Sequence, residues 1–169
     1  MKLRNMTAIY IFNEDKILML YRIGSIVFTG PLWTGVGGHF EDNELNEPEK
    51  CILRELFEET GITVNDINGL NLKYITIRKS KDEIRQQYIY FAELINKSIG
   101  LLPCNEGNLE WVHINDILKL KMSFTNYECL KHYFSTGKND DYLYSGVVNV
   151  INDIPKIDFI SLKDFKMNY

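Results

Sequence analysis

The chain contains few cysteines, and their arrangement does not predict a covalent or metal-based framework. The three cysteines, Cys51, Cys104 and Cys129, are far apart, odd in number and include no Cys-x-x-Cys pair. Disulfide frameworks and structural zinc sites need paired or closely spaced cysteines, so the sequence argues against both. We therefore expect a reducing compartment and a cytoplasmic protein.

The sequence also lacks a long hydrophobic run and an excess of positive charge. No stretch approaches the roughly 20 apolar residues of a membrane span. The apolar run near the N-terminus ends at residues 13–15 without a small-residue cleavage site, so we expect a strand there and not a signal peptide. The formal net charge of −4 argues against a broad basic surface. We expect neither a membrane nor duplex nucleic acid as a partner.

The remaining composition is that of an ordinary globular protein. Hydrophobic residues make up 45% and charged residues 25% of 169 residues, and no repeat or low-complexity tract is present. A chain of this length is typical of one domain. We assign residues 1–151 to that domain and expect 152–169 to be a C-terminal tail packed on it. A role of the tail at a sheet edge or a subunit contact stays open.

Segments rich in β-branched and aromatic residues alternate with helical segments. The expected strands are 6–12, 17–22, 70–78, 84–94, 111–114 and 142–151. Polar residues 79–82 predict a hairpin between the third and fourth of these strands. Strands with interspersed helices predict an α/β fold, in which helices cover a mixed β-sheet.

Two helices are predicted from the signals at their ends. The first is expected over 47–60, with Asn46 as N-cap in a capping-box pattern and Gly61 after its last residue. A second capping-box pattern at Thr125 opens a helix that Gly137 ends. The apolar face of the first helix is expected to consist of Ile52, Leu53, Leu56 and Phe57.

The first helix carries three glutamates on one side. At 3.6 residues per turn, Glu55, Glu58 and Glu59 span only about 100° of the helix. Like charges four residues apart cost roughly 0.2–0.5 kcal/mol in an isolated helix. A hard divalent cation such as Mg²⁺ would remove this repulsion and could bridge to phosphate. The alternative is a solvated acidic face on which Arg54 pairs with Glu58.

The residues around this helix follow a spaced pattern. Residues 37–44 read GGHFEDNE, and residues 54–62 read RELFEETGI. This pattern resembles the Nudix box, G-x5-E-x7-R-E-U-x-E-E-x-G-U, where U is a bulky aliphatic residue. The second half fits without mismatch, but nine residues separate Glu44 from Arg54 where the pattern has seven. A loop can absorb two residues at little cost, but the insertion leaves the usual partner role of Glu44 open.

The resemblance implies a Nudix α/β/α sandwich with a mixed β-sheet, in which the box forms a loop–helix–loop. The chain resembles the MutT type, whose members hydrolyse nucleoside triphosphates, including oxidised purine ones. In that type a Trp and a small polar residue precede the double glycine, as Trp33 and Thr34 do here. A further glutamate lies about five residues before a Trp-containing strand, as Glu106 lies before Trp111.

The resemblance also implies roles within the box. The residues expected to be catalytic are Arg54, Glu55, Glu58 and Glu59, and Arg54 would orient the glutamates by charge-assisted hydrogen bonds. The expected ligands of Mg²⁺, or of Mn²⁺, are the carbonyl of Gly37 and the carboxylates of Glu55, Glu58, Glu59 and Glu106. A metal-bound water would be the nucleophile, and its base would be a box glutamate or Glu106. An ordinary loop carboxylate is an equal alternative for Glu106.

The candidates for substrate binding are Arg22, Thr34, Gly38, His39, Phe124 and Asn126. Arg22 and His39 would donate to phosphate. Thr34, Phe124 and Asn126 would line a base pocket, by stacking and by hydrogen bonding to the base edge. The alternatives are a solvated Arg22, a packed His39 and a core Phe124. Oxidised-purine relatives usually carry Asn at the Thr34 position and acids near Asn126, so 8-oxo-purine specificity stays open.

The leading functional hypothesis is Mg²⁺-dependent hydrolysis of a nucleoside triphosphate, ordinary or oxidised (8-oxo-dGTP-like), to the monophosphate and pyrophosphate. One alternative is hydrolysis of another diphosphate-linked compound, such as ADP-ribose, a sugar nucleotide or a 5′-triphosphorylated RNA. Another is a nucleotide-binding regulator without catalysis, against which the intact glutamates argue. The expected partner is a small-molecule nucleotide, and the sequence is compatible with a monomer or a homodimer.

Overall fold

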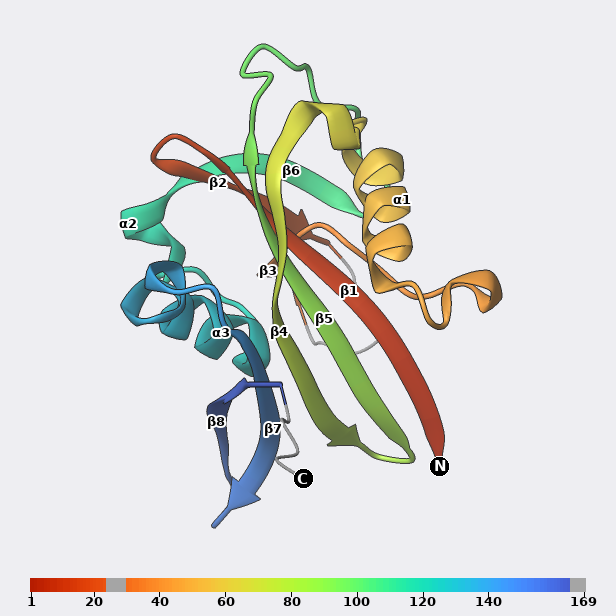
Figure 1. Cartoon of the computed structure of the whole chain (residues 1–169), viewed down its shortest axis with the longest axis vertical. Helices are drawn as coiled ribbons and strands as arrows, with labels where there is room; N and C mark the ends of the chain where they lie inside the picture. The colour runs from red at the N-terminus through yellow and green to blue at the C-terminus, as the bar shows by residue number, and fades with distance from the viewer. Residues whose placement is uncertain (24–29, 165–169) are drawn as a thin grey trace.

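The protein forms an α/β/α sandwich, as the sequence predicts. The structure, a computed structural model, describes residues 1–23 and 30–164. A mixed sheet separates helix α1 (Pro48–Thr60) from helices α2 (Ile114–Ile117) and α3 (Phe124–Ser135), which lie on its other side (Figure 1). None of these helices is long and apolar enough to cross a membrane, within the residues described.

Eight strands form the sheet. They are β1 (Lys2–Asn13), β2 (Lys16–Arg22), β3 (Leu32–Thr34), β4 (Ile67–Ser80), β5 (Glu83–Leu94), β6 (Gly107–His113), β7 (Leu143–Ile151) and β8 (Ile154–Leu162). Their order is β3-β2-β1-β5-β4-β7-β8, and β6 pairs with β2. The pairs β1–β5 and β4–β7 are parallel, whereas the other pairs are antiparallel. The predicted hairpin over 79–82 is confirmed as the turn between β4 and β5.

The sheet has a hydrophobic core on each face, because successive side chains of a strand point to opposite faces. On the α1 face, Ile52 and Leu56 are fully buried against odd-numbered residues of β1, such as Ile9. On the α3 face, Leu130 packs with even-numbered residues of β1, such as Tyr10. The side chain of a β1 residue therefore points to the α1 face if its number is odd and to the α3 face if its number is even.

Helix α1 differs in detail from its prediction. It begins at Pro48, and Glu47 occupies the N-cap without a side-chain hydrogen bond, so the predicted N-cap at Asn46 is wrong by one residue. Gly61 has a left-handed backbone (φ 78°) and donates its amide to the carbonyl of Phe57, as expected for a residue that ends a helix. The predicted apolar face is also partly wrong, because Phe57 is 55% exposed. Cys51 is buried in its place.

The N-cap of helix α3 lies two residues earlier than predicted. The hydroxyl of Ser123 accepts a hydrogen bond from the amide of Asn126, which makes Ser123 the N-cap and not Thr125. The helix ends at Ser135, and Gly137 starts a short 3₁₀ turn over Gly137–Asn139. This start places Phe124 and Asn126 in the first turn of α3.

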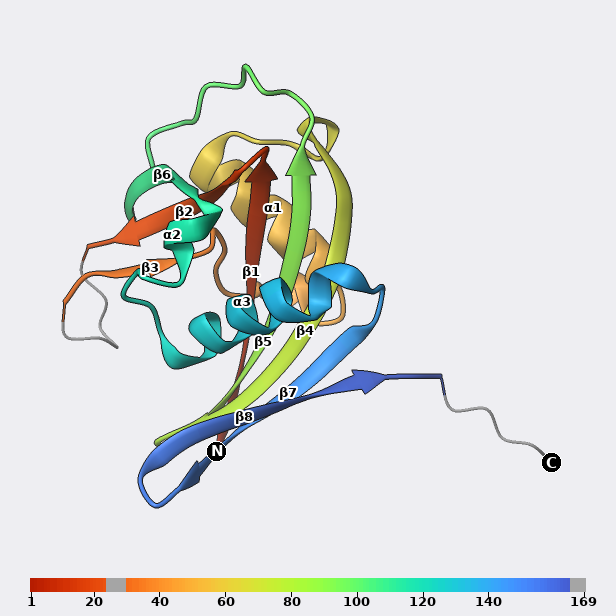
Figure 2. The same cartoon turned by 90° about the vertical axis from the view of Figure 1, so that its left-hand side faces the viewer.

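Residues 152–164 extend the same sheet. Asn152 and Asp153 both have positive φ and form the turn of a tight hairpin between β7 and β8. The lower part of the sheet, where β1 begins and β4 turns into β5, extends beyond α3 (Figure 2). The part of the α3 face near the N-terminus is thus not covered by that helix.

Candidate active site

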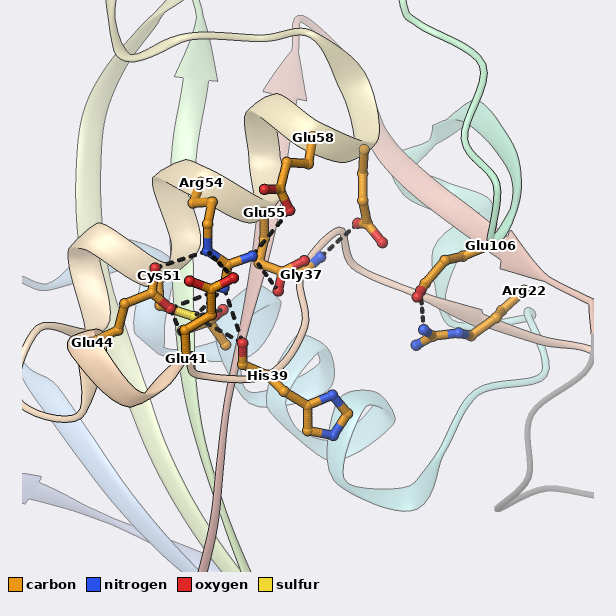
Figure 3. Close-up of polar contacts among 12 residues, drawn as sticks. Arg22, Gly37, His39, Glu41, Glu44, Cys51, Arg54, Glu55, Glu58 and Glu106 are labelled. Atoms are coloured by element: carbon orange, nitrogen blue, oxygen red, sulfur yellow. Dashed lines mark hydrogen bonds and ion pairs between the residues drawn. The ribbon is translucent and has the colours of Figure 1, made fainter.

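Arg54 is the centre of the polar network on α1 (Figure 3). Its guanidinium makes two hydrogen bonds with the carboxylate of Glu44, from Nε to Oε1 (2.8 Å) and from Nη2 to Oε2 (2.9 Å). Glu44 is only 1% exposed, and these bonds lower its pKa to about 2. The two extra residues before the helix therefore do not prevent the pairing of Glu44 with Arg54, which the sequence left open.

The same guanidinium also orients two of the three clustered glutamates. Its Nη1 donates to Oε1 of Glu55 and to Oε2 of Glu58, both at 3.0 Å. Its Nη2 donates to the carbonyl of His39 at 3.0 Å, which fixes the loop that precedes the helix. One cation thus contacts three carboxylates and a loop carbonyl, in the fork geometry that suits arginine.

Glu59 belongs to the same side of the helix but has a different partner. Its Oε2 accepts a hydrogen bond from the amide of Gly37 at 2.9 Å. Burial raises the pKa of Glu59 to about 7, the charges of Glu55 and Glu58 add to the rise, and the Gly37 amide opposes it. Burial likewise raises the pKa of Glu55. Burial therefore disfavours the ionised forms of Glu55 and Glu59, although Arg54 lies beside Glu55.

The double glycine lets the loop approach both β1 and α1 closely. Gly37 has φ 142°, and a Cβ there would lie 2.4 Å from the carbonyl oxygen of Thr7. A Cβ at Gly38 would lie 2.4 Å from Oε1 of Glu55. The amide of Thr7 donates to the carbonyl of Gly38 at 2.8 Å, so the loop is bound to β1. A side chain at either position would displace the loop or the carboxylate.

The donor set fits a hard divalent cation, although its members make other contacts in this conformation. Within residues 1–23 and 30–164, no three acidic, histidine or cysteine side chains converge as a metal site, because Arg54 and the Gly37 amide hold the box glutamates. Their chemistry is nevertheless suitable: the cluster supplies oxygen ligands, and burial makes its ionised state unfavourable without a counter-charge.

Arg22 and Glu106 form an ion pair apart from the helix cluster (Figure 3). Both side chains are partly exposed, at 34% and 45%. Roles for Arg22 in phosphate binding and for Glu106 in metal binding stay predictions.

The predicted base-pocket residues are brought together in part. The side-chain amide of Asn126 donates from Nδ2 to Oγ1 of Thr34 at 3.1 Å, across 92 positions of sequence. Asn126 is 5% exposed, whereas Phe124 in the same helical turn is partly buried. The side chain of His39 points away from the glutamates (Figure 3), and its Nε2 accepts from Nη1 of Arg4 at 3.3 Å. Arg4 was not a sequence candidate.

Comparison with known proteins gives the family and the fold of the chain. The NUDIX domain matches residues 1–133. The uncharacterized Nudix hydrolase YvcI of Bacillus subtilis is 29% identical over 124 residues, which is 72% of this chain and 73% of that protein. A MutT protein from Bacillus halodurans has a similar fold (TM-score 0.66, 22% identity, 92% of this chain and 97% of that chain). A NUDIX hydrolase from Nitrosomonas europaea is also similar (TM-score 0.69, 16% identity, 88% and 80%).

The chain belongs to the NUDIX domain family, because the family match covers more than half of its residues. Its fold is similar to that of the MutT protein from Bacillus halodurans. Nudix hydrolases are pyrophosphohydrolases, and this chain is an enzyme of that class, acting on a nucleoside diphosphate-linked substrate. The family generally uses divalent metal ions.

Proposed function

We propose that the protein hydrolyses a nucleoside 5′-triphosphate, ordinary or oxidised, to the monophosphate and pyrophosphate in a Mg²⁺-dependent reaction. The observation that carries the proposal is the acidic cluster next to the double-glycine loop, of which Glu55 and Glu59 are largely buried. Glu55 is 14% exposed and Glu59 7% exposed, and Gly38 lies against the Glu55 carboxylate. Such a cluster is costly for the fold alone, which supports a function for it.

Glu55, Glu58 and Glu59 would hold the cation, with the Gly37 carbonyl and Glu106 as further candidates. A bound Mg²⁺ or Mn²⁺ would supply charge neutralisation at the phosphates and an acidified water. Arg54 would position Glu55 and Glu58 through the two 3.0 Å hydrogen bonds that it makes to them. Glu44 would keep Arg54 in that position, because it is buried and binds the guanidinium through both oxygens.

The remaining substrate contacts would come from the loop and from the α3 face of the sheet. Arg22 and His39 would donate to phosphate oxygens. Thr34 and Asn126 would bind the edge of the base, and Phe124 would lie beside it. The 3.1 Å hydrogen bond between Asn126 and Thr34 supports this assignment, because it presents an amide and a hydroxyl together beside the first turn of α3.

The direct test is a quantified product analysis over a panel of substrates. The panel contains the common and the oxidised nucleoside triphosphates, ADP-ribose, a sugar nucleotide and a 5′-triphosphorylated RNA, each with Mg²⁺, Mn²⁺ or EDTA. Release of pyrophosphate and monophosphate from a triphosphate, suppressed by EDTA, is the expected result. A preference for ADP-ribose or a sugar nucleotide would replace the proposed substrate class, and release of no product from any substrate of the panel would contradict the proposal.

The assignment of the site predicts the effect of Glu58→Gln. This change removes one carboxylate of the cluster but conserves its size, so turnover should fall at least about 100-fold while the fold is retained. The matched control is Glu49→Gln, an exposed glutamate in the first turn of the same helix. Activity is measured beside thermal unfolding, and unchanged turnover in Glu58→Gln would refute the metal-site assignment.

A further inference from the structure

Three arginines lie side by side across three neighbouring strands of the sheet. The register places Arg4 of β1 opposite Arg85 of β5, and Arg85 opposite Arg78 of β4. Register partners have their side chains on the same face, about 4.5–5.5 Å apart at Cβ in the antiparallel pair and about one strand spacing of 4.8 Å apart in the parallel pair. Like charges in this arrangement destabilise a sheet. We call Arg4, Arg85 and Arg78 the arginine row.

The protein supplies only part of the negative charge that this row needs. Glu83 pairs with both Arg4 and Arg85 through its two oxygens. Arg78 is partly buried and makes no ion pair or side-chain hydrogen bond within residues 1–23 and 30–164. Burial lowers the pKa of Arg78, and the charge of Arg85 lowers it further. The row therefore has one carboxylate for three guanidinium groups.

The row lies on the same face of the sheet as the predicted base pocket. Arg4 is an even-numbered residue of β1, like Tyr10, which contacts the α3 core. This end of the sheet extends beyond α3 (Figure 2), so the helix does not cover it. The uncompensated charge thus faces the side from which Thr34 and Asn126 would bind the nucleoside.

His39 connects the row to the acidic cluster. Its carbonyl accepts from Arg54 at 3.0 Å, whereas its ring accepts from Arg4 at 3.3 Å. Thr7, which donates to the carbonyl of Gly38, is three residues from Arg4 along β1, or about 10 Å at 3.3 Å per residue. Arg85 and Arg78 lie one and two strands further across the sheet, at roughly 4.8 Å per strand. A ligand that reaches them must therefore extend along the α3 face beyond the nucleoside.

We propose that Arg78 and Arg85 bind a second phosphate group of the substrate, attached beyond the nucleoside and remote from the diphosphate that is cleaved. The inference rests on the proposed function, because it assigns the second phosphate to the same substrate. A phosphate would supply the missing negative charge to the row, and paired guanidinium groups suit its oxygens. The preferred substrate is then a nucleotide phosphorylated on both sides of its sugar.

The kinetic test compares three substrates with the same base. They are a nucleoside 5′-triphosphate, its 3′-phosphorylated form and a 5′-triphosphorylated dinucleotide. The wild type should favour a doubly phosphorylated substrate by about 10-fold in kcat/KM. Arg78→Gln should abolish this preference, mainly through KM, and leave the plain triphosphate unchanged. Equal kcat/KM for all three substrates in the wild type would overturn the inference.

The control variant is Lys79→Gln, which removes a positive charge from the next residue of β4 on the opposite face. It should keep the preference. Arg78→Lys keeps the charge without the planar fork and should retain part of it. Because Arg78 adds like charge to the row, Arg78→Gln should fold as well as the wild type, or better, in thermal unfolding. A loss of fold in Arg78→Gln would instead assign Arg78 a structural role.

A binding measurement without turnover separates this inference from the proposed function. In EDTA, titration calorimetry compares a nucleoside 5′-monophosphate with the nucleoside 3′,5′-bisphosphate. The extra phosphate should tighten binding about 10-fold in the wild type and not in Arg78→Gln, even if no triphosphate is hydrolysed. Equal affinities would contradict the second phosphate site while leaving hydrolysis intact.

Discussion

At the residue scale, Arg54 joins the loop and the helix of the box. It donates to Glu44 on one side and to Glu55 and Glu58 on the other, and it is 22% exposed. The bonds to Glu44 are the most protected of these, because Glu44 is 1% exposed whereas Glu58 is 55% exposed. Loss of Glu44 should therefore disturb both stability and the position of the acidic cluster.

Glu44→Gln should destabilise the fold by about 3 kcal/mol at pH 7, because it leaves Arg54 without its buried partner. The pKa of Glu44 is lowered from 4.5 to about 2, so its contribution is complete above pH 4.5 and is lost as the pH falls towards 2. Urea unfolding of both proteins at several pH values should show a difference that shrinks below pH 4.5. A difference that stays constant down to pH 3 would contradict this account.

The sequence predicted some of the contacts between individual residues but not all of them. The side chains of the box were identifiable because their spacing is local to one loop and one helix. The pairing of Asn126 with Thr34 was expected only as a shared pocket. The arginine row was missed, because it depends on the register of three strands whose partners lie up to 81 positions apart, as Lys2 and Glu83 do. An arginine within a strand does not by itself show which residues of the neighbouring strands lie beside it.

At the element scale, alanine substitutions at the two glycines of the loop, Gly37 and Gly38, should have different effects. Gly37→Ala places a Cβ against the backbone of Thr7 at a left-handed φ, and the backbone cannot yield. Gly37→Ala should cost more than about 1 kcal/mol of stability. Gly38→Ala meets the end of the Glu55 side chain, which can rotate away. It should keep the fold but lower turnover about 10- to 100-fold by displacing that carboxylate.

Thermal unfolding and steady-state kinetics of the two variants check this contrast. A stable, inactive Gly38→Ala beside an unstable Gly37→Ala is the predicted outcome. If Gly38→Ala were fully active, the closeness of the loop to Glu55 would have no functional role.

Helix ends were predicted less well than helix positions. The N-caps at Asn46 and Thr125 were wrong, by one and two residues, because several polar residues precede each helix and only the backbone dihedrals select one. Gly61 was predicted correctly, since a left-handed residue after a helix strongly favours glycine. Local chemistry therefore identifies an end best where a single residue type can satisfy the backbone.

At the scale of the whole molecule, the β7–β8 hairpin lies outside the family match but is part of the core. The ring of Phe159 in β8 lies 5.1 Å from that of Tyr74 in β4 and 4.7 Å from that of His132 in α3. Phe159→Ala should therefore lower the free energy of unfolding by roughly 1–3 kcal/mol. The control is Ile160→Ala on the opposite face of β8, where the side chain is 68% exposed.

Denaturant unfolding of both variants decides whether the hairpin belongs to the same cooperative unit. Equal stability of the two variants would place the hairpin outside it. The sequence predicted a strand over 142–151 and left the following residues ambiguous, because the exposed face of β8 mixes polar residues such as Lys156 with apolar ones such as Ile160, so regular alternation is absent. The local signal for the pairing of β8 with β7 was the turn of Asn152 and Asp153, which was missed.

The most direct test of the central claim is Mn²⁺ binding to the nucleotide-loaded protein, measured by electron paramagnetic resonance. A non-hydrolysable triphosphate analogue keeps the complex intact during the titration. The wild type and Glu49→Gln should bind Mn²⁺ equally and release it to Mg²⁺, whereas Glu55→Gln and Glu58→Gln should bind it at least about 10-fold more weakly. Equal Mn²⁺ affinity in all four proteins would show that the acidic face of α1 is not the cation site.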